Sequence, residues 1–197
     1  MNTEFEDGAK LKGYKSICGI DEAGRGPLAG PVYAAAVILP DDTQIEGLND
    51  SKKLSEKKRE QLFDVITQKA ISYCVATASV EEIDEMNILR ATMLAMKRAV
   101  EGLDIPADYA FVDGNCMPDL TIDGETIIKG DARCQSVAAA SILAKVSRDR
   151  YMYELDKLVP QYCFAKHKGY GTKLHYECLR ENGISVYHRK TFLKKMH

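Results

Sequence analysis

The sequence lacks any long hydrophobic run. Its 197 residues contain no stretch of about 18 consecutive apolar residues, which excludes a membrane-spanning helix. It also lacks a basic N-terminal region followed by an apolar segment, because it opens with the acidic and polar MNTEFEDGAK. We therefore expect no secretory signal, no membrane attachment and a cytoplasmic location.

The cysteines lack the spacing of a metal or redox motif. The six cysteines are scattered, and no two of them are arranged as C-x-x-C. This spacing argues against a zinc site or a thiol redox centre. Without an export signal, reduced and buried thiols are the expected state.

Net charge is also small, −2 at neutral pH, and that value alone does not suggest a nucleic-acid partner. The distribution is uneven, however, because residues 129–197 hold 14 Lys and Arg against 6 Asp and Glu, whereas residues 1–128 hold 13 against 23. A basic C-terminal third beside an acidic remainder fits a polyanion-binding face next to a cation-binding site. Ordinary solvated surface charge gives the same totals, so both interpretations stay open here.

The length and composition predict one globular domain over residues 1–197. Hydrophobic residues make up 45% and charged residues 28% of the chain, and no repeat or low-complexity linker interrupts it. Apolar runs predict strands over 14–20, 31–39, 71–78 and 108–113. Capping residues and helical periodicity predict helices over about 55–70, 79–86, 87–101, 133–158 and 172–182. Asp123-Gly124 predicts a hairpin turn, and the whole pattern favours an α/β sheet flanked by helices.

Four acidic residues lie where an apolar run meets a loop or a helix: Asp21, Glu22, Asp113 and Asp131. Buried carboxylates are unfavourable unless a cation neutralises them. Oxygen ligands without adjacent His or Cys favour Mg²⁺ or Mn²⁺ over zinc. Several carboxylates in one pocket can hold two such ions roughly 4 Å apart, the arrangement used for phosphoryl displacement. The residues taken alone also fit turn formers and helix caps.

The neighbouring pair Asp21 and Glu22 presents a geometric difficulty. Consecutive side chains on an extended strand point to opposite faces. The two residues share a metal site only if the chain turns at Glu22, or if Glu22 contributes its backbone carbonyl. The Ala23-Gly24 that follows favours the turn.

The segment IDEAGRGPLAGPV (20–32) resembles the signature of the ribonuclease HII family. Four further blocks follow in the family's order: NDSKKLS (49–55), FVDGN (111–115), KGDARCQSVAAASILAKVSRDR (129–150) and HKGYGTKLH (167–175). Five ordered blocks across about residues 14–194 are far more specific than a lone Gly-Arg-Gly. The resemblance implies a ribonuclease H-like mixed five-stranded sheet flanked by helices, with a helical C-terminal extension over about 160–197 that contacts substrate.

The resemblance also implies residue roles. It assigns two divalent ions, Mg²⁺ or Mn²⁺, to Asp21, Glu22, Asp113 and Asp131. It assigns contact with the ribose 2′-hydroxyl to Gly24, Arg25 and Gly26, and reading of the sugar at the RNA–DNA junction to Tyr170. Phosphate contacts are expected from Lys52, Lys53, Ser141, Lys145, Arg148, Lys166, Lys168 and Lys173. Alternatives remain for two of these residues: Tyr170 as a core aromatic, and Lys145 as the ion-pair partner of Asp149.

The reaction that the resemblance implies is hydrolysis of the RNA strand of RNA–DNA hybrids, and cleavage 5′ of a single ribonucleotide embedded in duplex DNA. The products carry a 3′-hydroxyl and a 5′-phosphate. The expected partner is the nucleic acid itself, and we expect a monomer. Two other functions stay open: a metal-dependent phosphatase on small nucleotides, which the basic C-terminal third disfavours, and a non-catalytic hybrid-binding module, which the complete set of acids disfavours.

Overall fold

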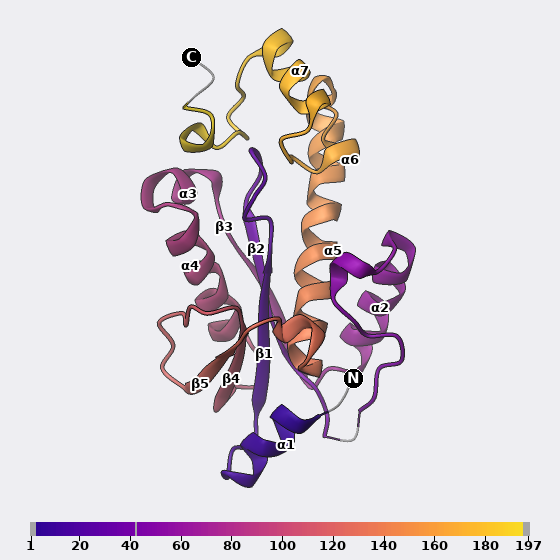
Figure 1. Ribbon diagram of the computed structural model, residues 1–197, viewed down its shortest axis with the longest axis vertical. Coiled ribbons are helices and arrows are strands. Elements are labelled where there is room, and N and C mark those ends of the chain that lie inside the picture. Colours follow the sequence, from indigo (N-terminus) through magenta and orange to yellow (C-terminus); the bar gives the residue numbers. More distant parts are fainter. Residues whose placement is uncertain (1–2, 42, 195–197) are drawn as a thin grey trace.

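A computed structural model describes residues 3–41 and 43–194; the other residues, including the last three of the expected C-terminal extension, lie outside the described part. Figure 1 shows an elongated molecule in which a central sheet runs between two layers of helices. The strands are β1 (Ile17–Ala23), β2 (Val32–Ile38), β3 (Ser72–Ala78), β4 (Tyr109–Asp113) and β5 (Asp123–Ile127). The α-helices are α1 (Glu4–Leu11), α2 (Glu56–Lys69), α3 (Val80–Met86), α4 (Ile88–Glu101), α5 (Gln135–Leu158), α6 (Phe164–His167) and α7 (Lys173–Asn182).

The sheet has the order β3-β2-β1-β4-β5. β1 pairs antiparallel with β2, and β2 with β3, whereas β1 and β4, and β4 and β5, pair in parallel. The predicted mixed five-stranded sheet is therefore confirmed. Because β1 and β4 run in the same direction, the residues at their carboxyl ends meet at one edge, where ligands bind in open α/β sheets.

Both faces of the sheet are buried, and the alternation along β2 shows how. Val32, Ala34 and Ala36 pack into a core with α4, whereas Ala35 and Val37 pack into a second core with α5 and α2. Small residues bring α5 close to the sheet. A Cβ added to Gly19 on β1 would lie 2.1 Å from the carbonyl carbon of Ser136, so only glycine fits there.

The helix caps agree with the sequence-based predictions. The Ser55 side chain accepts a hydrogen bond from the Lys58 amide at the start of α2, and Ser79 and Glu82 form the predicted capping box of α3. Thr172 caps α7, which ends at Gly183 with a φ of 73°. Each cap satisfies a backbone group that the helix itself leaves unpaired.

Three local predictions were wrong or incomplete. Asp123-Gly124 forms no hairpin: it begins β5, which runs parallel to β4, and Gly124 is required because a Cβ there would lie 2.5 Å from the Ala110 carbonyl oxygen. The polar N-terminal segment forms the helix α1, which the sequence analysis did not predict. β1 extends to Ala23 rather than ending before Asp21, because it continues to pair with β2.

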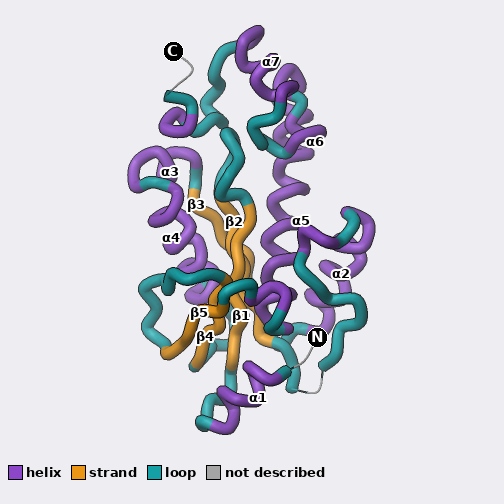
Figure 2. Tube along the Cα trace, viewed as in Figure 1, coloured by secondary structure: helices purple, strands orange, loops and turns teal. Residues whose placement is uncertain are grey.

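The C-terminal residues fold back over the loop that joins β1 to β2. Figure 2 shows this loop reaching from the strands towards α6 and α7. Its Leu28 and Ala29 pack into a third core with Met152, Phe164 and Leu179 from the C-terminal half of the chain. Within the described residues, no helix is both long and apolar enough to cross a membrane.

Candidate active site

Asp21 and Asp113 lie at the edge where the parallel strands end. They directly follow Ile20 and Val112, the last residues at which β1 and β4 pair with each other. Asp131 reaches the same edge from a short 3-10 turn, Gly130–Ala132, whose Gly130 amide donates a 2.7 Å hydrogen bond to Oδ1 of Asp113. Together with Glu22, these residues form what we call the acidic cluster: Asp21, Glu22, Asp113 and Asp131.

Burial and mutual repulsion raise the pKa of three members of the acidic cluster. Asp21 is only 4% exposed, and burial, then Glu22 and Asp113, hold its pKa well above the usual range. Burial also raises the pKa of Glu22, against the opposing effect of Arg25, whose guanidinium lies 3.5 Å from Glu22 Oε1. Burial and the neighbouring Asp113 raise the pKa of Asp131. The cluster therefore carries more negative charge than its surroundings neutralise.

Lys52 is a second cation, besides Arg25, that lies beside this cluster. It lies in the 3-10 turn Ser51–Lys53, where Asp50 caps the Lys52 amide at 2.9 Å. Burial alone would lower the pKa of Lys52, but attraction to Asp21, Asp131, Asp50 and Asp113 outweighs it and raises the pKa. A lysine whose ammonium group is stabilised by four carboxylates marks a site built for positive charge.

The chemistry of the acidic cluster fits a hard divalent cation. All its side-chain donors are carboxylate oxygens, which Mg²⁺ and Mn²⁺ prefer. The raised pKa values of Asp21, Glu22 and Asp131 show that positive charge is in deficit. In residues 3–41 and 43–194, no three His, Cys, Asp or Glu side chains already converge tightly enough to enclose an ion.

The expected turn at Glu22 is not observed. Glu22 pairs with Ala34 of β2, so the chain stays extended through this position. The charges of Asp113 and Lys52, as well as that of Arg25, nevertheless shift the pKa of the Glu22 carboxyl group. The side chain therefore lies close to the other members of the cluster without a backbone turn.

Beside the cluster lies a pocket of about 210 Å³. We call it the loop pocket, and its lining residues are Glu22, Ala23, Gly24, Arg25, Gly26, Ser51, Lys52, Ser141, Lys145 and Tyr170. Seven of the twelve residues expected to contact substrate are among them. Segments far apart in sequence thus meet in one hollow next to the carboxylates.

Tyr170 lies at the rim of the loop pocket. Its side chain is 43% exposed, which excludes the core aromatic as an interpretation, and its ring carbon Cε1 would lie 3.7 Å from a Cβ on Gly26. The backbone directly before Tyr170 is fixed by a hydrogen bond, because the Leu28 amide donates to the Gly169 carbonyl at 2.8 Å. The exposed ring and the Gly-Arg-Gly loop therefore face one another across the hollow.

Arg148, another residue expected to contact substrate, lies behind the pocket rather than in it. Its side chain is 1% exposed, and it donates to the carbonyl oxygens of Ala29, Pro31 and Lys168 at 3.1, 3.3 and 3.0 Å. The prediction that Arg148 contacts phosphate does not agree with this position, because the guanidinium faces backbone carbonyls in the interior.

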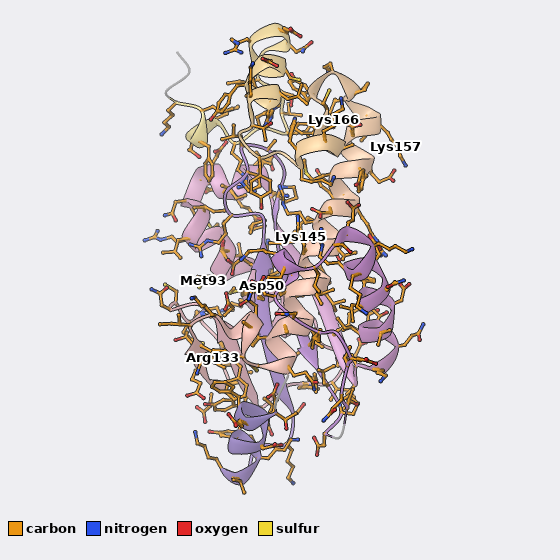
Figure 3. All side chains as sticks on the ribbon, turned by 45° about the vertical axis from the view of Figure 1, so that its right-hand side comes forward. Asp50, Met93, Arg133, Lys145, Lys157 and Lys166 are labelled. Atoms are coloured by element: carbon orange, nitrogen blue, oxygen red, sulfur yellow. The ribbon has the colours of Figure 1, made fainter. Side chains whose placement is uncertain are left out.

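Other predicted phosphate contacts have partners within the chain. Lys145 forms a 2.7 Å ion pair with Asp149, the alternative weighed from the sequence, while still lining the pocket. Ser141 lines the pocket and lies 2.8 Å from the Ser51 hydroxyl. Lys168 lies 3.9 Å from the centre of the Tyr153 ring. Figure 3 shows Lys166 near the C-terminal end of the molecule, with Lys145 and Asp50 nearer its middle.

Buried histidines support the turn that carries Tyr170. His175 Nδ1 donates to the Tyr170 carbonyl at 3.0 Å, and its Nε2 lies 3.1 Å from Nε2 of His188. His188 Nδ1 accepts from the Ser185 amide and hydroxyl. These partners assign both rings as neutral, with His188 donating to His175. His167, whose ring bonds the Tyr162 carbonyl and the Gly169 amide, is structural in the same way.

Two residues at this site were missed from the sequence. Asp50 lies inside the quoted block NDSKKLS, where an acid directly before Ser-Lys-Lys was a usable capping signal. Arg189 lies near the C-terminus and is fully buried. It donates to the carbonyls of Gly24, Arg25 and Gly30 at 2.7, 3.0 and 2.9 Å. No sequence pattern predicts such a side chain, because all its hydrogen-bond acceptors are backbone carbonyls.

Comparisons with known proteins identify relatives of this chain. The family model described as Ribonuclease HII matches residues 18–197. A ribonuclease HII from Clostridioides difficile (strain 630) is 54% identical over 192 residues, covering 98% of this chain and 75% of that protein. The crystal structure of ribonuclease H2 from Pyrococcus horikoshii OT3 is 29% identical, with a TM-score of 0.72 over 90% of this chain and 93% of that one. The Mn²⁺ complex of Bst-RNase HIII shares the fold, at 19% identity and a TM-score of 0.68 over 85% of this chain and 63% of that one.

Proposed function

Because this chain belongs to the ribonuclease HII family, we propose that the acidic cluster and the loop pocket together form its active site. The protein is an endoribonuclease that cleaves RNA in RNA–DNA hybrids and ribonucleotides embedded in DNA. The observation that carries the assignment is the position of the loop pocket, which places Gly24, Arg25 and Tyr170 directly beside Glu22 and Lys52.

Ribonucleases H generally depend on divalent metal ions. The carboxylates of the acidic cluster are the residues that would hold them here, as two Mg²⁺ or Mn²⁺ ions. When bound, such ions supply Lewis-acid stabilisation to the attacking and leaving oxygens of an in-line displacement. In their absence, Lys52 and Arg25 partly neutralise the cluster.

The loop pocket reads the sugar. The backbone of Gly24, Arg25 and Gly26 approaches the ribose closely because glycine carries no side chain, and the 2′-hydroxyl is the group that separates ribose from deoxyribose. Tyr170 presents its exposed ring to the neighbouring sugar. A site that bonds the 2′-hydroxyl leaves a polar group unpaired when that hydroxyl is missing, which gives strong discrimination.

The surrounding cations position the phosphate backbone. Lys52 lies between the cluster and the pocket, where it can orient the scissile phosphate, and Lys166 and Lys173 of the C-terminal extension extend the basic surface. Such contacts carry little sequence information, so we expect slight sequence preference. Cleavage 5′ of a single ribonucleotide leaves a 3′-hydroxyl and a 5′-phosphate. All of these residues come from one chain, so we propose that the protein acts on DNA as a monomer. We also propose the cytoplasmic location expected from the sequence.

The test is to map the cut in a duplex that bears one ribonucleotide, with and without Mg²⁺. We expect a single cut 5′ of the ribonucleotide for the wild-type protein. Asp113→Asn should abolish cleavage while retaining binding, and turnover like that of the wild type would remove Asp113 from the metal site. Arg25→Ala combined with Tyr170→Ala should lose discrimination between ribose and deoxyribose. Retained selectivity would place the reader elsewhere.

A further inference from the structure

Two buried arginines lie behind the loop pocket, and all their hydrogen-bond acceptors there are backbone carbonyls. Arg189 bonds the carbonyls of Gly24, Arg25 and Gly30. Arg148 bonds those of Ala29, Pro31 and Lys168. The two side chains therefore hold both ends of the loop that joins β1 to β2.

The bonds of Arg189 determine which way the loop's amides point. All peptide bonds in the described part of the chain are trans, so each carbonyl is directed opposite to the amide N–H of the next residue. With the Gly24 and Arg25 carbonyls turned inward to the guanidinium, the Arg25 and Gly26 amides point away from it. Within residues 3–41 and 43–194, neither amide donates to a protein acceptor. Both residues line the loop pocket.

Arg148 ties this loop to the turn that carries Tyr170. Its Nη2 holds Ala29 of the loop while its Nη1 holds the Lys168 carbonyl, two residues before Tyr170. The guanidinium carbon also lies 5.9 Å from the centre of the Tyr170 ring. A Cβ on Gly24 would lie 2.1 Å from Arg148 Nε, so the loop rests directly on this side chain. One residue thus fixes the distance between the two walls of the pocket.

Burying these charges is unfavourable, which argues for a role beyond stability. In the described part of the chain neither arginine forms a salt bridge, and burial lowers the pKa of each. An apolar side chain would fill the same space without the loss of hydration. A planar guanidinium can bind two or three carbonyls at fixed angles, which neither an apolar residue nor lysine can do.

We propose that Arg148 and Arg189 are positioning residues that set ribose discrimination, by aiming the Arg25 and Gly26 amides into the loop pocket and fixing their distance from Tyr170. The inference rests on the proposed function of that pocket. It predicts that replacing either guanidinium, with its several N–H donors, by a single ammonium group misaligns the Arg25 and Gly26 amides even though the positive charge remains.

The experiment compares Arg189→Lys and Arg148→Lys, which keep the charge, with the wild-type protein. Binding is measured by fluorescence anisotropy in EDTA, so that no cleavage occurs, on a DNA duplex with one ribonucleotide and on the all-DNA duplex of the same sequence. We expect the ratio of the two Kd values to fall about tenfold in each variant, the equivalent of about 1.4 kcal/mol or one aligned hydrogen bond. Affinity for the all-DNA duplex should change less than about twofold, since the net charge is kept.

Arg98→Lys is the matched control. Arg98 also donates to a backbone carbonyl, that of Thr77 at 2.9 Å, but it lies on α4, away from the loop pocket. This variant should keep the full ratio. An unchanged ratio in both Arg189→Lys and Arg148→Lys, even with lowered thermal stability, would show that the arginines are structural only. A wild-type protein without any preference would overturn the proposed pocket itself.

A measurement on the wild-type protein covers the case in which a variant does not fold. The amide resonances of Arg25 and Gly26 should shift on addition of the duplex with one ribonucleotide and shift much less with the all-DNA duplex. Equal shifts with both duplexes would overturn the inference, because the amides would then not sense the 2′-hydroxyl.

Discussion

The buried pair His175 and His188 makes the stability of this protein depend on pH in a direction that the structure determines. Each ring is almost fully buried, and the two share a single hydrogen bond between their Nε2 atoms at 3.1 Å. Protonating His175 would place two N–H groups against each other at this contact, and protonating His188 would place its Nδ1–H against the Ser185 amide N–H. Burial, together with the neighbouring rings, lowers the pKa of each to about 4.

The magnitude follows from the difference between folded and unfolded protein. An unfolded histidine has a pKa of about 6.5, so between pH 6.5 and 4 these two histidines bind more protons in the unfolded chain than in the folded one. Their contribution to stability therefore rises with pH in that window and is lost as the pH falls through it. From pH 7 to pH 5, each histidine removes about 2 kcal/mol of the free energy of unfolding, a large part of the roughly 5–15 kcal/mol of an ordinary domain.

The assay is urea denaturation followed by circular dichroism, because the chain has no tryptophan. The raised carboxyl pKa values of the acidic cluster act in the opposite direction, so the wild-type curve alone is not decisive. His188→Gln cannot titrate and keeps an N–H donor near the Nε2 position. Its destabilisation relative to wild type should shrink by about 2 kcal/mol between pH 7 and pH 5.

The control for this measurement is Ser55→Ala, which removes a helix cap without a titrating group. Its destabilisation of about 1 kcal/mol should be the same at both pH values. If the difference between wild type and His188→Gln were also independent of pH, the histidines would not be held neutral in the folded protein, and the reasoning would fail.

Three further predictions concern the sheet and the acidic cluster. Gly19→Ala should destabilise the protein by about 3 kcal/mol in urea denaturation, because α5 leaves no space for a Cβ; a loss below about 0.5 kcal/mol would contradict that packing. Lys52→Met should tighten Mn²⁺ binding about fivefold by calorimetry, since one competing positive charge is removed, while slowing cleavage; weaker Mn²⁺ binding would separate Lys52 from the cluster. Asp113→Asn should weaken Mn²⁺ binding in the same assay, and unchanged affinity would exclude Asp113 as a ligand.

The sequence was sufficient for the elements whose signal is local. The capping box at Ser79 and Glu82 and the end of α7 at Gly183 depend on residues within one helical turn, so composition and spacing predict them. The prediction of a hairpin at Asp123-Gly124 was wrong because this dipeptide occurs both in hairpin turns and where a strand closely approaches its neighbour. Here the glycine allows β5 to approach the Ala110 carbonyl of β4, a contact that no local pattern contains.

The candidate site divides in the same way. Its carboxylates and its Gly-Arg-Gly loop lie in ordered sequence blocks, so the resemblance located them, and the structure brings the loop and Tyr170 to one pocket. Arg148 was expected to contact phosphate because it lies in the same ordered block as Ser141 and Lys145. The helix is covered on both sides, and Arg148 turns towards the loop instead. Helical spacing predicts which residues share a face, but not which protein segment covers that face.

The role of Arg189 could not be predicted from the sequence and became apparent only in the folded structure. Its acceptors are carbonyls of Gly24, Arg25 and Gly30, and every residue type offers the same carbonyl. The amino-acid types at these positions therefore do not reveal that their carbonyls accept hydrogen bonds from Arg189. A ribose reader built from backbone amides, as proposed for this loop, would depend on whatever holds that backbone. Here two buried cations hold it from positions more than a hundred residues away in the chain. Their positive charge lies behind the pocket proposed to receive a polyanion, so in that proposal bound substrate would partly offset the unfavourable burial.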